Sequence, residues 1–461
     1  MFVGTIGCRN SWPHVTHAPP TARPSAPMKQ RSVPWRQWFL LGAALLAAVQ
    51  DLSAADDLPI AAPEQVGMSS QRLKRVGALM QKYIDSKQLA GTVTLIARRG
   101  KVVHFEARGY RHVEEKLPMK KDTVFVIMSM TKPIVSTALM MEFEKGKFLL
   151  DDPLSKWLPE FADPQVAVRN GTGEDAAFVR VDAEQPPTIR HVLTHTGGLN
   201  TPRGALTAEE RDRSRLGGRP ETVEKALLQT AGLPLNFQPG TRWQYGRETN
   251  FVAVLVEKMS EMTMDDYLHQ RILAPLEMQD THYNVPESKV GRVAAVYSPA
   301  PNGTIRLRRA PGYLPATTYF PGTYGLSSTA ADYYRFLQLI LNGGELDGVR
   351  LLGPKTVDLM ISNHIGDLAV SLRGPGYGFG LGFSVLLDAG KSKEPLSPGS
   401  FGWGGAYCTY FFVDPVEELI GVFMTQMVPY RHIDVRGQFA VLASQAITES
   451  TKPIGGYRSL R

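Results

Sequence analysis

The stretch Val126-Ile127-Met128-Ser129-Met130-Thr131-Lys132-Pro133 places a serine three residues before a lysine, where an apolar extended run gives way to a helix. Apolar residues from 134 to 143 then recur at near-helical spacing, and Gly146 ends the pattern. Positions three apart share one face of a helix, so the Lys132 amine should lie beside the Ser129 hydroxyl. The pair is a candidate nucleophile with a candidate base.

A serine hydroxyl attacks a substrate rapidly only when a neighbouring group takes its proton. An amine can do this only when neutral, which requires burial and the positive end of a helix to lower its pKa from about 10.4. The alternative is that Ser129 caps a helix and Lys132 is solvated on the first turn. A serine-lysine pair at this spacing is common by chance, so the rest of the chain must decide between the two interpretations.

The N-terminal segment has the order of a secretory signal peptide. A basic segment with Lys29, Arg31 and Arg36 precedes an apolar run over 38–49, and small residues follow at 53–55. The run is too short for a stable membrane span. We therefore expect residues 1–55 to be a leader cleaved near Ala55, with Met28 as a candidate true start, and the mature protein to be periplasmic or secreted without a membrane span.

Net charge and cysteine content exclude some classes of partner and of stabilising bond. The chain has 461 residues and a formal net charge of +7, but five basic residues and one acidic residue lie in the leader. The mature chain is thus only about +3, which gives no argument for a nucleic-acid partner. Cys408 is the only cysteine outside the leader, so an internal disulfide is excluded and the core must supply the stability. The sequence says nothing about oligomeric state.

The two ends of the mature chain predict one antiparallel sheet covered by helices. Ser69 or Ser70 should cap a first amphipathic helix, and a last helix is expected over 435–446. Strand-like runs are found at 92–97, 102–107, 377–387, 405–413 and 419–426. Residues 163–187 and 201–221 are predicted to be loop-like.

The fold class is therefore α/β of the α+β type, with a mostly helical subdomain inserted into a sheet subdomain. We expect the sheet subdomain at about 56–125 and 300–461, and the helical subdomain at about 126–299. A cleft between such subdomains is a common place for a site.

Three further stretches carry residues that could take part in catalysis or in metal binding. His191 and His195 lie four apart on a predicted helix over 189–199, but a zinc hydrolase helix needs a glutamate where Val192 stands, so structural histidines are favoured. Tyr245 lies at a loop-to-helix junction, where it could relay protons or simply pack. The segment Gly402-Trp403-Gly404-Gly405-Ala406 precedes a predicted strand, and its backbone N–H groups could donate to an oxyanion; the alternative is a turn or bulge entering an edge strand.

Taken together, these features resemble the serine β-lactamase-like superfamily, which includes class C β-lactamases, penicillin-binding proteins and family VIII carboxylesterases. The resemblance covers about Gln65 to Ser444. It is carried by Ser129-Met130-Thr131-Lys132, Leu150-Asp151-Asp152-Pro153-Leu154, Leu193-Thr194-His195-Thr196-Gly197-Gly198-Leu199, Tyr245, Ala274-Pro275-Leu276-Glu277-Met278 with Asp280-Thr281, Gly325-Leu326-Ser327-Ser328-Thr329-Ala330 with Asp332, and Trp403-Gly404-Gly405.

The resemblance implies roles for particular residues. Ser129 matches the acylated nucleophile, Lys132 its proton acceptor or partner, and Tyr245 the tyrosine that shares base duty and protonates the leaving group. The backbone N–H groups of Ser129 and Ala406 match the oxyanion hole. No metal or organic cofactor is implied.

Two departures from the lactam and peptide enzymes favour another substrate. Arg247 stands where those enzymes use an asparagine, and Trp403 and Gly404 stand where they use a lysine and a threonine that bind the substrate carboxylate. The Trp-Gly-Gly form of Trp403, Gly404 and Gly405 is the one seen in family VIII esterases. An aromatic wall suits a neutral acyl or alcohol group, whereas Arg247 could restore carboxylate binding if it pointed into the cleft.

The sequence therefore predicts a serine hydrolase for small-molecule carboxylic esters, with short acyl chains and a weak side activity on β-lactams. A β-lactamase or D-alanyl-D-alanine carboxypeptidase anchored by Arg247 is the alternative within enzymes. A penicillin-binding sensor that is acylated without turnover is the alternative from another class, and a zinc hydrolase is the most remote.

Overall fold

The computed structural model describes residues 58–171, 177–199, 205–214, 220–310, 312 and 316–451. The expected leader at 1–55, its cleavage near Ala55 and the candidate start at Met28 lie outside the described residues. In the part of the chain that is described, no helix is both long and apolar enough to cross a membrane. The limits of the two expected subdomains stay a prediction.

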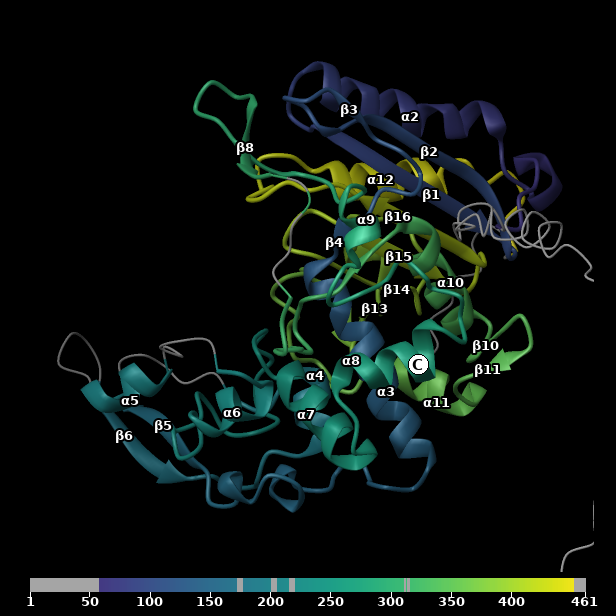
Figure 1. Cartoon of the computed structure of the whole chain (residues 1–461). Coiled ribbons are helices and arrows are strands. Elements are labelled where there is room, and N and C mark those ends of the chain that lie inside the picture. The colour runs from purple at the N-terminus through teal and green to yellow at the C-terminus, as the bar shows by residue number, and fades with distance from the viewer. Residues whose placement is uncertain are drawn as a thin grey trace, which may run out of the picture. The chain divides into compact units, whose positions relative to one another are not determined.

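A large antiparallel sheet is built from both ends of the chain, as predicted (Figure 1). Its eight strands follow the order β12-β13-β14-β15-β16-β1-β2-β3. The strands are β1 (Gly91–Arg98), β2 (Lys101–His112), β3 (Leu117–Pro118), β12 (Tyr377–Phe379), β13 (Ser384–Leu386), β14 (Phe401–Gly404), β15 (Tyr410–Asp414) and β16 (Leu419–Met424). Every residue of β1 is buried, because β1 lies between β2 and β16 and both faces of the sheet are covered.

Helices cover the two faces of this sheet. Helices α2 (Ser70–Asp85) and α12 (Val435–Ser444) pack together on one face, and α10 (Ala330–Leu341) packs on the other. Side chains alternate along β15: Phe411 contacts Tyr333 of α10, whereas Phe412 contacts Phe439 of α12. The expected cap of the first helix is Ser69, whose hydroxyl accepts the Arg72 N–H.

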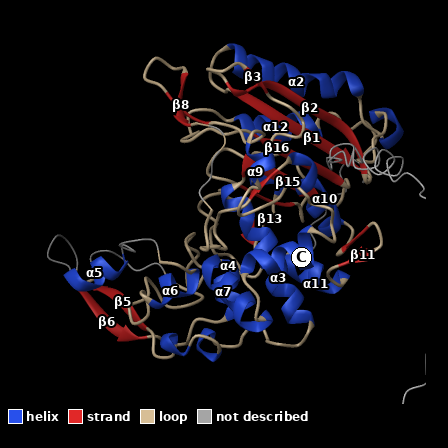
Figure 2. Ribbon diagram, in the orientation of Figure 1, coloured by secondary structure: helices blue, strands red, loops and turns tan. Residues whose placement is uncertain are grey.

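The middle of the chain is mostly helical, also as predicted (Figure 2). Helix α3 lies at the centre of this region and is buried over most of its length, because α7 and α8 pack against it. The helices are α3 (Thr131–Glu144), α4 (Ile189–Thr194), α5 (Ala208–Ser214), α6 (Val223–Leu228), α7 (Thr249–Ser260), α8 (Met264–Leu268), α9 (Glu287–Val290) and α11 (Pro354–Met360). Short strand pairs are β4 (Phe125–Val126) with β9 (Ser327–Ser328), β7 (Val296–Pro299) with β8 (Ile305–Arg309), and β10 (Glu345–Leu346) with β11 (Val349–Arg350).

Several boundaries differ from the prediction. The predicted loop over 163–187 contains the hairpin of β5 (Gln165–Asn170) and β6 (Ala177–Asp182), in which β-branched residues pair across the strands despite the polar composition. The predicted helix over 189–199 ends earlier, because His195 takes a left-handed conformation with a φ of 59°. Part of the charged segment over 201–221 forms α5, and residues 200–204 and 215–219 lie outside the described residues.

Two predicted strands also change. The run over 377–387 divides into β12 and β13, because the chain reverses between them through Gly382, whose φ is +100°. The segment that we expected to precede a strand is itself β14, which pairs with β13 and β15 inside the sheet and so is not an edge strand. Gly405 belongs to the turn after β14, and the next strand begins only at Tyr410.

One buried arginine forms hydrogen bonds to segments from both the N-terminal and the C-terminal parts of the sheet region. Arg98, at the end of β1, is 0% exposed. Its guanidinium donates to the carbonyls of Val66, Gly67, Glu417 and Glu449 at 2.7–3.0 Å, and it meets the Glu417 carboxylate at 2.7 Å. A single side chain therefore joins the segment before α2 to the β15–β16 turn and to the segment after α12.

Replacing Arg98 with methionine should lower the free energy of unfolding by about 3–5 kcal/mol, because a buried carboxylate and several carbonyls would lose their donor. Urea unfolding followed by circular dichroism measures the change. Arg99→Met is the matched control: the Arg99 side chain is exposed, so a change within about 0.5 kcal/mol is expected. Equal stability of both variants would contradict this role of Arg98.

Candidate functional site

Ser129 lies in the single 3₁₀ turn η3 (Met128–Met130), between strand β4 and helix α3. Ile127 and Met130 on either side of it are buried, whereas Ser129 is partly exposed. The Ile127 N–H donates to the Leu326 carbonyl at 3.0 Å, and the Ile127 carbonyl accepts the Thr409 hydroxyl at 3.3 Å. The serine is therefore held on a turn that is fixed from two sides.

The Lys132 amine lies next to this serine, as the spacing predicted. Its Nζ atom is 3.5 Å from Ser129 Oγ and donates to the Thr323 carbonyl at 2.9 Å. Lys132 is only 3% exposed, and burial lowers the pKa of its amine, while the Tyr245 phenol opposes part of that shift. The environment therefore favours the neutral amine that a base requires.

The acceptor of Lys132 is itself held in place. Asn250, near the start of α7, accepts the Thr323 N–H at 3.1 Å and the Thr323 hydroxyl at 2.8 Å through Oδ1. Sequence reasoning did not identify Asn250 or Thr323, because neither belongs to a local pattern with Ser129. Thr323 lies 191 residues beyond Lys132 in the chain.

Tyr245 completes the cluster. Lys132 Nζ lies 4.5 Å from the centroid of its ring, and the Trp403 indole N–H donates to its hydroxyl at 3.2 Å. The ring is enclosed by Trp243, which is stacked at 6.1 Å, and by His195 and Trp403 at 4.9 Å and 5.2 Å between centroids. Trp403 is thus a hydrogen-bond donor to Tyr245, which was not expected from the sequence, and its role as an aromatic wall for the substrate stays a prediction.

The turn after β14 packs directly against the serine segment. A Cβ atom added at Gly405 would lie 2.3 Å from the Ile127 carbonyl oxygen, so only glycine fits there. The Gly405 N–H donates to the Thr409 carbonyl at 2.8 Å, and the Cys408 N–H donates to the Gly405 carbonyl at 3.1 Å. Ala406 is exposed in the turn that follows β14. The oxyanion roles of the Ser129 and Ala406 N–H groups stay a prediction.

A buried histidine and glutamate lie behind Tyr245. His195 Nδ1 is 3.6 Å from Glu248 Oε2. Burial raises the pKa of Glu248 to about 8, although hydrogen bonds from the Leu199, Gly197 and Gly198 N–H groups lower it in part. Burial also lowers the pKa of His195 well below its usual range. At neutral pH both groups are therefore mainly uncharged. The sequence analysis did not identify Glu248, although an ionisable residue directly before an apolar helix can indicate a buried group with a shifted pKa.

The other candidates have separate environments. Arg247 is partly buried, and burial lowers the pKa of its guanidinium while the Tyr319 phenol opposes this; its role in carboxylate binding stays a prediction. His191 Nδ1 accepts the Thr188 N–H at 3.1 Å at the start of α4. Within the described ranges, no group of three or more His, Cys, Asp or Glu side chains is arranged to hold a metal ion.

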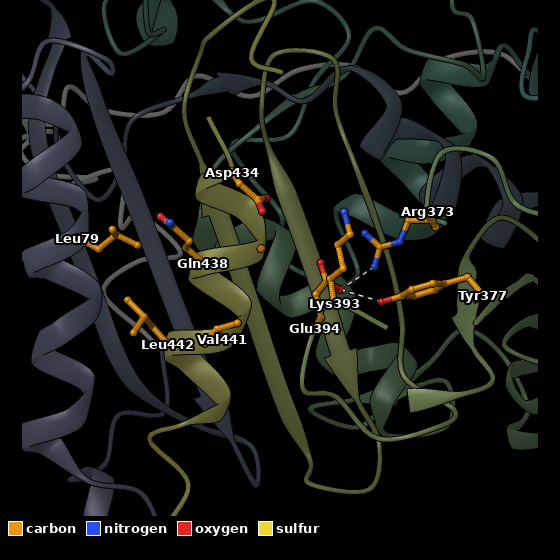
Figure 3. Close-up of a pocket in the computed structure, with 10 residues that line it drawn as sticks. Leu79, Arg373, Tyr377, Lys393, Glu394, Asp434, Gln438, Val441 and Leu442 are labelled. Carbon is orange, nitrogen blue, oxygen red and sulfur yellow. Dashed lines mark hydrogen bonds and ion pairs between the residues drawn. The ribbon is translucent and has the colours of Figure 1, made fainter. Parts of the chain in front are cut away.

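A cavity of about 330 Å³ lies between α2, α12 and β12 (Figure 3). Leu79, Gln438 and Leu442 line one side of it, while Arg373 and Tyr377 lie near Glu394 on the other side. The Glu394 carboxylate accepts hydrogen bonds from Arg373 at 2.8 Å and from Tyr377 at 3.0 Å. None of Ser129, Lys132 and Tyr245 lines this cavity, so it is separate from the serine site.

Comparisons with known proteins show the family of the chain. The model of the family described as Beta-lactamase matches residues 76–443. An uncharacterized protein of Mycobacterium tuberculosis is 33% identical over 391 residues, which are 82% of this chain and 95% of that protein. Esterase EstB of Burkholderia gladioli is 29% identical over 363 residues, which are 74% of this chain and 86% of the esterase.

A solved structure agrees in fold. EstCE1, described as a hydrolase with promiscuous acyltransferase activity, superposes with a TM-score of 0.69 at 28% identity, over 82% of this chain and 99% of EstCE1. The family match and the structural likeness each cover most of the chain. The chain therefore belongs to the β-lactamase family and is a serine hydrolase with the β-lactamase-like fold.

Proposed function

We propose that this protein hydrolyses carboxylic esters with short acyl chains through an acyl-enzyme on Ser129, with weak hydrolysis of β-lactams as a side activity. The observation that carries the proposal is the buried Lys132 amine 3.5 Å from Ser129 Oγ, in a cluster with Tyr245 and Trp403. The likeness to esterase EstB and to EstCE1 supports ester hydrolysis.

In the acylation step, Ser129 Oγ attacks the ester carbonyl carbon, and its proton passes to the neutral Lys132 amine. The N–H groups of Ser129 and Ala406 stabilise the negative charge on the former carbonyl oxygen. When the tetrahedral intermediate collapses, the carbon–oxygen bond to the alcohol breaks. The alkoxide takes the proton back from Lys132 through Tyr245 and leaves as the alcohol.

In the deacylation step, a water molecule attacks the acyl carbon and gives its proton to the same base. The bond between that carbon and Ser129 Oγ breaks, the proton returns to Oγ, and the carboxylic acid is released. Each cycle therefore consumes one water molecule and restores the neutral Lys132 and the free hydroxyl. No metal or organic cofactor enters either step.

The preference for esters is argued from Trp403. Its indole donates to the Tyr245 hydroxyl, and its ring meets Phe379 at 5.4 Å, so an aromatic surface stands where lactam enzymes carry a lysine. A site without that cation loses the contact that would favour an anionic lactam or a peptide carboxylate. A neutral ester suits such a wall better.

Ser129→Ala should lower kcat/KM for p-nitrophenyl butyrate by at least about 1,000-fold while leaving the thermal unfolding curve unchanged. The purified mature protein is assayed with this ester and with nitrocefin, and Ser70→Ala, at an exposed serine on α2, is the matched control. Near-wild-type turnover by Ser129→Ala would refute the proposal. Nitrocefin hydrolysis faster than ester hydrolysis would favour the lactamase alternative with Arg247 as anchor.

The rate of Ser129 acylation should rise with pH and reach its plateau below about pH 10.4, the usual pKa of a lysine. The sign follows from burial: a lowered pKa makes the neutral, proton-accepting form of Lys132 available at lower pH. Stopped-flow measurement of the p-nitrophenol burst against pH gives the apparent pKa. Lys132→Arg should show no plateau and little activity, because a guanidinium stays protonated; a wild-type pH profile in that variant would exclude Lys132 as the base.

Trp403→Lys should raise the ratio of kcat/KM for nitrocefin to kcat/KM for p-nitrophenyl butyrate. A hydrogen bond from a new ammonium to the lactam carboxylate contributes about 1.5–3 kcal/mol, which corresponds to about 10- to 150-fold. Trp403→Phe, which retains an aromatic wall and adds no charge, is the control and should leave the preference for the ester. An unchanged ratio in Trp403→Lys would show that this position does not set selectivity.

A further inference from the structure

The first turn of α12 carries a guanidinium that contacts the turn after β14. Arg436 donates through Nη2 to the Gly405 carbonyl oxygen and through Nη1 to the Tyr430 hydroxyl at 2.5 Å. Its guanidinium carbon also lies 4.0 Å from the centroid of the Tyr430 ring. Tyr430 therefore fixes the position of Arg436 by a hydrogen bond and by a cation–π contact.

The Gly405 carbonyl and the Ala406 N–H are the two ends of one peptide unit. Because that unit is planar and trans, a hydrogen bond to the oxygen also fixes the direction of the N–H. A donor on the oxygen draws electron density from the nitrogen and makes the N–H a stronger donor, an effect of about 10–30% per hydrogen bond. Two donors act here, the Arg436 guanidinium and the Cys408 N–H.

The contact between Arg436 and the end of β14 helps to explain why residue 404 is a glycine. A Cβ atom at Gly404 would lie 2.9 Å from Arg436 Nη1, 3.1 Å from its Cζ and 2.9 Å from the Thr409 carbonyl oxygen, so the guanidinium and this carbonyl together occupy the space that a side chain there would need. Gly404 and Arg436 are therefore complementary. The Trp-Gly-Gly segment admits a cation behind the strand, on the face opposite to Trp403, since neighbouring residues of a strand point to opposite faces.

We propose that Arg436 is a positioning residue that orients and polarises the Ala406 N–H toward the oxyanion of the tetrahedral intermediate. This inference rests on the proposed function, in which Ala406 supplies one of the two oxyanion donors. Arg436 acts through the peptide unit and does not touch the substrate, so it should contribute to kcat and leave KM nearly unchanged.

The test compares Arg436→Met with Arg436→Lys in the mature protein. Loss of a complete oxyanion donor costs about 100- to 1,000-fold in rate. A donor that is weakened by about 10–30% but still present should therefore cost about 2- to 8-fold. Arg436→Met should therefore lower kcat for p-nitrophenyl butyrate by about 2- to 8-fold at constant KM, and Arg436→Lys should recover part of the loss. Arg431→Met, at an exposed arginine before α12, is the matched control and should retain wild-type kcat.

A second readout separates positioning from a general structural role. A p-nitrophenyl alkylphosphonate forms a tetrahedral adduct on the active serine whose oxygen occupies the oxyanion site. Its rate of reaction with Arg436→Met should fall by the same factor as kcat, and added guanidinium ion, below the concentration that unfolds the protein, should restore part of both rates. Should Arg436→Met fail to fold, the kcat and phosphonate rates of Arg436→Lys decide the matter.

Wild-type kcat and phosphonate rates in Arg436→Met would overturn the inference, and so would a rise in KM at unchanged kcat. Failure of the proposed function would look different: the wild-type protein itself would then not be phosphonylated at Ser129. The two failures are distinguished in one experiment, because the wild-type reaction is its reference.

Discussion

Burial of the Lys132 amine beside Ser129 is the constraint on which the site depends. An ammonium ion enclosed by protein loses its hydration, and the Thr323 carbonyl, which accepts a hydrogen bond from the amine, compensates only part of the loss. The fold thereby stabilises the neutral amine relative to the charged one. Asn250 fixes Thr323, and the first turn of helix α3 places the Lys132 amine 3.5 Å from Ser129 Oγ. The elements that build the helical region thus also lower the pKa of the Lys132 amine, in the direction that the proposed chemistry requires.

The sheet contributes Trp403 and the turn after β14 to the site, and one close contact brings this turn against the segment of Ser129. Gly405 approaches the Ile127 carbonyl so closely that no side chain fits, and this brings the turn after β14 against the turn that carries Ser129. Trp403 lies two residues before Gly405 and points to the same side. Its indole N–H donates a hydrogen bond to the Tyr245 hydroxyl. Arg436 supports the turn from the opposite face of the sheet. Ser129, Tyr245 and the turn after β14 therefore come from three segments that meet only in the folded chain.

Local patterns in the sequence predicted the parts of this arrangement that are encoded locally. The structure confirms the proximity of Ser129 and Lys132, the cap at Ser69 and the antiparallel sheet built from both ends of the chain. Ser129 itself lies in the 3₁₀ turn before helix α3 and not on that helix. The catalytic and oxyanion roles assigned to these residues stay predictions. The predictions that were wrong concern segments where backbone geometry overrides composition, such as the hairpin of β5 and β6 and the left-handed His195.

Contacts between distant segments could not be predicted from the sequence. Thr323, Asn250 and Arg436 carry no local signature, because each acts on a group far away in the chain. The Trp403 indole shows the same limit, since its type predicts an aromatic wall but not a hydrogen bond to Tyr245. Such contacts are fixed only when the sheet and the helical region pack together.

The most direct test of the account is mass spectrometry of the protein quenched in acid during turnover of p-nitrophenyl butyrate. The account predicts an intact mass increased by one butyryl group, followed by a peptide digest that places this group on Ser129 and a return to the original mass once the ester is consumed. Unmodified protein throughout turnover, or an acyl group on another residue, would contradict the central claim that Ser129, activated by the buried Lys132, is the nucleophile.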